Sequence, residues 1–157
     1  MIKRWRITVP LFALIHVSRS PTTTGVSPSY AKGELDRAIA DYTEALRLDD
    51  SSALVFNNRG YAFFDKGEYD RAIADYDQAL RLDSRFAAAF NNRGLAYLRK
   101  NKLELASADF SAAIKLDPKF ALAYFNRGIA FSRIGKNVQA DADRRIALQL
   151  DPTLSKE

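Results

Sequence analysis

The sequence predicts an all-α fold in which one helix–turn–helix unit is repeated along the chain. Residues 56–60 recur at 90–94 and at 124–128, so the chain repeats with a period of 34 residues. Small and apolar side chains follow the i, i+4, i+7 spacing of an amphipathic helix, as Phe56, Gly60 and Phe63 illustrate. A second amphipathic stretch follows in each unit, and the two together indicate a helical hairpin.

The first helix of a unit ends at a residue suited to a tight turn. Gly67 lies between the predicted first and second helices, where a chain leaving a helix favours the left-handed conformation that Gly, and next Asn, adopts at low cost. The same place in the other units is occupied by Gly33, Asn101 and Gly135. The second helix is predicted from Ala72, Tyr76 and Ala79, and the pair Leu-Asp closes every unit. Pro118 and Pro152 stand just past second helices, where they end a helix without breaking it.

These boundaries divide the chain into an N-terminal segment, a repeat array and a short end. Residues 1–29 form a leader or disordered tail, residues 30–152 the array, and residues 153–157 a tail. Within the array, residues 33–52 supply only the second helix of an incomplete unit, and residues 53–86, 87–120 and 121–152 form complete units. The array therefore has about three and a half repeats.

The N-terminal segment differs from the array in composition. It has a basic start, an apolar run from residue 7 to 17, and no acidic side chain before Glu34. The run is shorter than the roughly 17 to 25 residues of a membrane-spanning helix, so we expect no transmembrane span. A secretory signal, an organelle transit peptide and a plain tail remain open. A cytoplasmic location is slightly favoured, and an exported or periplasmic one follows if the segment is a signal.

Charge and composition exclude several classes of function. All of the net charge of +5 lies in the first 33 residues, and the remainder has 19 basic and 19 acidic side chains, so we expect no nucleic-acid partner. The chain has no cysteine and one histidine, His16, which leaves no set of ligands for a metal and no histidine-based triad. No glycine-rich phosphate loop or activated nucleophile is present. We therefore expect neither a cofactor nor an enzymatic activity.

The pattern of aromatic and small residues resembles the tetratricopeptide repeat (TPR) family over residues 30–152. That family places aromatics at repeat positions 4, 11 and 24, and small residues at positions 8, 20 and 27, and three units here fill nearly all of these places. The resemblance implies a right-handed α-solenoid whose first helices line a concave face. Two departures concern the terminal proline, which Asp50 and Ser84 replace. A third is Arg144, which replaces the aromatic at position 24 and indicates that the array ends there.

The concave face gives the candidate binding site. At about 100° per residue, positions 2, 5, 6, 9, 12 and 13 of each first helix point away from the core. The candidate peptide-binding residues are Asn57, Asn58, Tyr61, Phe64, Asn91, Asn92, Leu95, Leu98, Arg99, Asn126, Ile129 and Arg133. We therefore expect an interaction module that binds an extended peptide segment of a protein partner.

Asn58, Asn92 and Asn126 stand in one column, which is similar to the asparagine ladder in the TPR superhelix of O-GlcNAc transferases. An amide offers a donor and an acceptor that suit a peptide backbone, and we expect the column to face solvent in the groove. Two alternatives stay open: the column was copied by duplication, or its amides bond neighbouring helices.

The carboxylate clamp with which some TPR cochaperones grip the EEVD terminus of chaperones is missing from this sequence. The clamp's positions hold Asn57, Tyr61, Asn92, Leu122 and Asn126, so only the central Asn is kept. The apolar neighbours favour a peptide with hydrophobic side chains, although a capping helix or self-association could cover the same patch.

A column of arginines occupies position 7 of the units. Arg59, Arg93 and Arg127 flank the core glycines and would be partly buried, and a column of aspartates runs along the second helices: Asp41, Asp75, Asp109 and Asp143. We predict Arg–Asp pairs within the chain, with an anion site as the alternative. The alternative to the adaptor function is a structural unit that self-assembles through its groove or its ends, and a monomer is favoured over a homo-oligomer.

Overall fold

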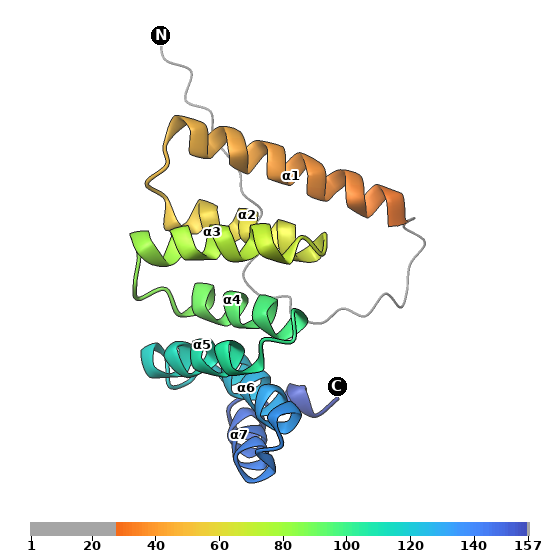
Figure 1. Cartoon of the computed structure of the whole chain (residues 1–157), viewed down its shortest axis with the longest axis vertical. Helices are drawn as coiled ribbons and strands as arrows, with labels where there is room; N and C mark the ends of the chain where they lie inside the picture. Colours follow the sequence, from red (N-terminus) through yellow and green to blue (C-terminus); the bar gives the residue numbers. More distant parts are fainter. Residues whose placement is uncertain (1–27, 157) are drawn as a thin grey trace.

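The computed structural model describes residues 28–156, and over this range the chain is an all-α solenoid without strands. The helices follow one another down a single stack, from α1 at one end to α7 at the other (Figure 1). The helices are α1 (Pro28–Leu48), α2 (Ala53–Asp65), α3 (Tyr69–Leu82), α4 (Ala87–Arg99), α5 (Leu103–Leu116), α6 (Ala121–Ile134) and α7 (Asn137–Leu150). No helix in this part of the chain combines the length and the hydropathy that a membrane crossing requires. The leader predicted for residues 1–29 lies outside the described residues, apart from Pro28 and Ser29, which begin α1.

The turn expected at Gly33 is absent, and this prediction was wrong. α1 continues through Gly33, and apart from the adjoining residues of this helix nothing lies within 4 Å of where its Cβ would be. The described residues contain no helix before α1, so no packing requires the chain to reverse at this point. A glycine in an exposed helix costs about 1 kcal/mol relative to alanine, and the helix tolerates it.

The other turn residues adopt the predicted conformation. Gly67 has φ of 79°, Gly135 has φ of 88°, and Asn101 is the one non-glycine residue among the described residues with positive φ, at 59°. Each of these residues lies in the turn between the first and second helix of a unit, so a left-handed residue forms the turn of each of these three hairpins.

The Leu-Asp pair that ends each unit has a structural reason. The carboxylate of Asp151 accepts hydrogen bonds from the backbone N–H of Thr153 at 3.0 Å and from its hydroxyl at 2.7 Å. The aspartates at the ends of the earlier units accept the backbone N–H two residues later in the same way: Asp49, Asp83 and Asp117. An aspartate is therefore suited to this position because it fixes the turn into the next helix.

The core is built from small residues and large rings in alternation. Tyr76 and Phe110 are fully buried, and the alanines beside them, such as Ala72 and Ala106, have no exposed surface. Small side chains let neighbouring helices approach closely, and the rings fill the space that remains.

The end of the described chain is more ordered than the predicted tail at residues 153–157. A 3₁₀ helix, η2 (Pro152–Lys156), follows α7, and Leu154 within it is buried. Leu154 is one repeat period after Phe120, the residue directly before α6, so η2 occupies the place where a further unit would start.

Candidate peptide-binding groove

The three first helices, α2, α4 and α6, contact one another along the array and carry the predicted site residues. The rings of Tyr61 and Phe64 stack on α2 with their centroids 6.5 Å apart. Leu95 is half-buried, and Ile129 is 38% exposed. Leu98 differs from these, because it is 8% exposed and belongs to the core around Phe110.

The asparagines form hydrogen bonds between consecutive first helices. The side-chain N–H of Asn92 donates to Oδ1 of Asn57 at 3.0 Å, and that of Asn126 donates to Oδ1 of Asn91 at 3.0 Å. The side-chain nitrogen of Asn57 also lies 3.4 Å from Oδ1 of Asn58. The amides thus join neighbouring helices, which was one of the alternatives that the sequence left open.

Most of these asparagine side chains are buried, whereas the column was expected to face solvent. Asn91 is 2% exposed and Asn126 is 3% exposed, and Asn57 and Asn58 are also buried. Only Asn92 is half-exposed. These amides can be buried because each lies between two closely packed helices, where the neighbouring amide takes the place of water as a hydrogen-bond partner. No described residue donates to Oδ1 of Asn92 or Asn126, so these oxygens remain acceptors.

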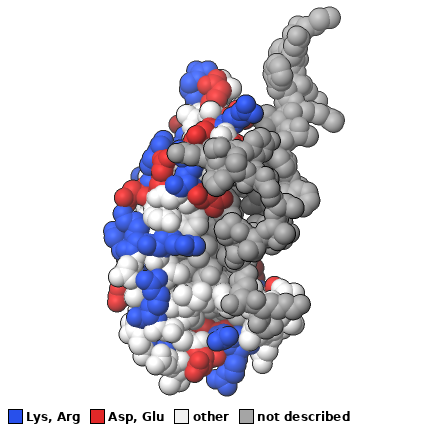
Figure 2. All heavy atoms as spheres, turned by 90° about the vertical axis from the view of Figure 1, so that its right-hand side faces the viewer, with Lys and Arg blue, Asp and Glu red and all other residues white. Residues whose placement is uncertain are grey.

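The two predicted arginines each bind the unit before their own. Arg133 donates to the backbone oxygen of Leu98 at 3.2 Å and to Oδ1 of Asn101 at 2.8 Å. Arg99 is exposed, and its guanidinium carbon lies 5.7 Å from the centroid of the Phe64 ring. On the molecular face that Figure 2 shows, Lys and Arg side chains alternate with acidic ones.

The predicted Arg–Asp pairs are confirmed. Arg93 makes two parallel hydrogen bonds to the carboxylate of Asp109, at 2.7 and 2.8 Å, and this interaction holds the pKa of Arg93 well above its usual value. Arg59 pairs with Asp75, and Arg127 with Asp143, in the same geometry.

Each of these three arginines has a second partner, which was not predicted from the sequence. Arg93 also reaches Asp77 on the preceding second helix, at 2.6 Å. The equivalent partners in the other units are the hydroxyls of Thr43 and Ser111. These three residues are 34 apart and each lies 16 residues before its arginine, so the spacing was a usable signal. Each arginine of this column therefore joins two consecutive units.

The described residues contain no group of three acidic or histidine side chains that could hold a metal ion. What they present is a row of apolar and amide groups across the first helices of stacked helical hairpins. Such an array defines a helical-repeat scaffold of the class that provides extended concave surfaces for binding.

The chain belongs to the TPR repeat family, whose pattern matches residues 29–67, 60–101 and 96–135. No protein of curated function matches the chain in sequence.

Solved TPR structures are similar to this chain. The second TPR domain of human RPAP3, in complex with an HSP70 peptide, is 37% identical, with a TM-score of 0.62 over 64% of this chain and 83% of that one. The first TPR of Spaghetti (RPAP3), bound to an HSP90 peptide, is 33% identical, with a TM-score of 0.64 over 66% and 82%. MamA is 25% identical, with a TM-score of 0.72 over 82% and 78%.

Proposed function

We propose that this chain is a protein-interaction module that binds an extended peptide segment of a partner along α2, α4 and α6. The observation that carries the proposal is a set of apolar groups on these helices that keep part of their surface exposed: Tyr61, Phe64 and Leu95 are half-buried, and Ile129 is exposed. The RPAP3 domains that resemble this chain are bound to peptides, which supports the same class of ligand here.

The asparagine ladder would align the peptide backbone. Asn92 and Asn126 are each held by a neighbouring amide, so their orientation is set before a ligand arrives. Oδ1 of Asn92, the half-exposed member of the column, can accept a backbone N–H of the peptide. A preorganised acceptor avoids part of the entropic cost of binding.

The peptide should be uncharged or mildly acidic and should carry apolar side chains. The carboxylate-clamp positions hold Asn57, Tyr61, Asn92, Leu122 and Asn126, which include no cation. Hydrogen bonds contribute about 0.5 to 1.5 kcal/mol each, and association costs about 4 to 15 kcal/mol, so apolar contacts supply most of the affinity. We expect a Kd of roughly micromolar magnitude that changes little with salt.

A peptide array followed by one pair of variants tests this function. Peptides selected on the full chain should bind Tyr61→Ser about tenfold or more weakly, because removing a ring from the groove loses about 1.5 to 3 kcal/mol of apolar contact. Leu105→Ser is the matched control, since Leu105 is an exposed apolar residue on the second helix α5. Equal binding by both variants and the unmodified chain would show that the peptide does not bind along α2, α4 and α6.

Self-assembly is the competing function and has a separate readout. Light scattering over a range of concentrations should give a constant mass for an adaptor. A mass that rises with concentration, together with an array that selects no peptide, would favour a structural unit.

A further inference from the structure

The last repeat lacks the ring that covers the core glycine in the other two repeats. A Cβ built on Gly60 would lie 2.8 Å from Cε1 of Tyr76, and one built on Gly94 would lie 2.7 Å from Cε1 of Phe110. In the last repeat the residue in the place of the ring is Arg144, and the three atoms nearest to a Cβ at Gly128 are backbone or Cβ atoms of α7. A ring-sized space is therefore left open.

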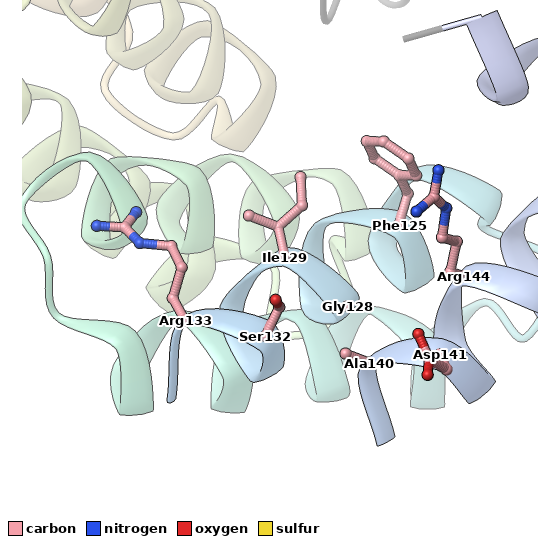
Figure 3. A pocket seen from close by; sticks show the side chains of 8 residues that line it. All are labelled: Phe125, Gly128, Ile129, Ser132, Arg133, Ala140, Asp141 and Arg144. Atoms are coloured by element: carbon pink, nitrogen blue, oxygen red, sulfur yellow. The ribbon is translucent and has the colours of Figure 1, made fainter. Parts of the chain in front are cut away.

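A cavity of about 350 Å³ lies at this position, between α6 and α7. Figure 3 shows that Phe125 and Ile129 point to the same side of α6, while the side chain of Arg144 rises from α7 beside Phe125. Gly128 lies between these side chains, and Ala140 adds a further apolar wall. Ile129 and Ala140 are equivalent to Leu95 and Ala106, which pack in the cluster of Phe110. The alanine of the following first helix that completes that cluster, Ala130, has no equivalent among the described residues after α7.

The mouth of the cavity carries a surplus of positive charge. Arg133 and Arg144 both line it, against one carboxylate, that of Asp141. The hydrogen bonds of Arg133 go to uncharged oxygens, and Arg144 is exposed and makes no ion pair with another described residue. A ring bound beside a guanidinium gains a cation–π contact, and a neighbouring carboxylate gains an ion pair.

We propose that this pocket binds an aromatic side chain of a partner peptide in which an acidic residue adjoins the aromatic one. The proposal rests on the peptide-binding function and names a subsite for it, because Ile129 and Arg133 belong to both surfaces. A second copy of the chain is a poor occupant, since every aromatic side chain described from residue 33 onward is buried or half-buried. From residue 33 onward, the described part of a second copy therefore offers no exposed ring for the pocket, whereas the positive charge at its mouth suits an acidic peptide.

Nuclear magnetic resonance titration of the full chain with two short probes tests the proposal. Acetyl-Glu-Phe-Glu-amide should shift the backbone signals of Gly128, Ile129 and Ala140, and its Kd should be at least fivefold lower than that of acetyl-Glu-Leu-Glu-amide. Arg144→Gln should weaken the Phe probe about threefold, while the preference for Phe over Leu remains. Equal affinity for both probes, or shifts confined to α2 and α4, would overturn the subsite.

A second variant fills the pocket from within. Arg144→Tyr restores the ring found in the other repeats and should weaken the Phe probe at least tenfold while helix content by circular dichroism is unchanged. Arg145→Tyr, one residue further along α7, is the matched control and should bind normally. If array peptides respond to Tyr61→Ser but the Phe probe ignores Arg144→Tyr, the subsite is wrong and the groove function stands. If dimers form in the unmodified chain and disappear in Arg144→Tyr, the occupant is a second copy and the proposal fails.

Discussion

The ring of Phe110 lies directly against the backbone of Gly94. A Cβ on Gly94 would come within 2.7 Å of Cε1 and 2.9 Å of Cδ1 of that ring. Non-bonded carbon atoms do not come this close, so any side chain at Gly94 must displace the fully buried ring of Phe110. Glycine is thus required at position 94 because the Phe110 ring packs so close to it, and not because the backbone turns there.

Gly94→Leu should lower the free energy of unfolding by about 1 to 3 kcal/mol or more, because overpacking forces the ring and the helix apart. Gly33→Ala is the control in an open helix position, and it should raise stability by about 0.5 to 1 kcal/mol. Urea denaturation followed by circular dichroism measures both. An unchanged midpoint for Gly94→Leu would contradict the close packing of α4 on α5.

Arg93→Ala should be among the most destabilising surface substitutions. It removes the partner of Asp109, whose carboxylate is buried, and the link to Asp77 on the preceding unit. Leaving a buried carboxylate unpaired costs about 3 kcal/mol, measured as the change in the urea midpoint. Arg47→Ala, which breaks the exposed pair with Glu44, should leave the midpoint where it is. Equal effects of the two substitutions would show that the arginine column does not hold the units together.

Tyr76→Phe should stabilise the protein. The hydroxyl of Tyr76 is buried and has no hydrogen-bond partner among the described residues, and burial raises the pKa of this group well above its usual value. Removing an unsatisfied buried hydroxyl recovers about 1 kcal/mol, and the product matches Phe110 in the next repeat. Thermal unfolding of Tyr76→Phe should therefore show a higher Tm, whereas Tyr97→Phe, at a half-exposed position, should not. A lower Tm for Tyr76→Phe would mean that the hydroxyl is satisfied.

Asn126→Ala should destabilise the array by about 1 to 3 kcal/mol, because it leaves Oδ1 of Asn91 buried without its donor. If these amides faced solvent, as expected from the sequence, the substitution would cost no stability. A double-mutant cycle with Asn91→Ala separates the two cases: coupling between the substitutions indicates the interhelical bond. Strict additivity would restore the view of a solvent-facing column.

The end of α7 should show a dependence on pH. The hydroxyl and backbone N–H of Thr153 hold the pKa of Asp151 below its usual value. A carboxyl whose pKa is lowered by folding stabilises the folded state above its unfolded pKa, and that contribution is lost as the pH falls through the folded pKa. Thr153→Val should raise the pKa of Asp151 measured by carboxyl resonance titration. No change would show that the backbone N–H alone sets it.

Most of the fold could be predicted because the same local pattern occurs in all three repeats. The period, the left-handed turns at Gly67, Asn101 and Gly135, and the Arg–Asp spacing all follow from contacts within one unit or between adjacent units. The site was less predictable. Helical angle places Leu98 on the groove side, but the shape of the neighbouring helices puts it in the core.

The sequence by itself determined the helical hairpins, their number and their order, because these depend on periodicity and on turn chemistry over short distances. Only the tertiary structure decided which groups satisfy one another between units. In the structure Asn126 is hydrogen-bonded to Asn91, and α1 continues through Gly33 without a turn. A cavity also lies beside Gly128, where Arg144 replaces the aromatic ring of the other repeats. The physical reason is that hydrogen-bond partners and empty space depend on how far apart packed helices lie, and that distance is set by all the side chains between them.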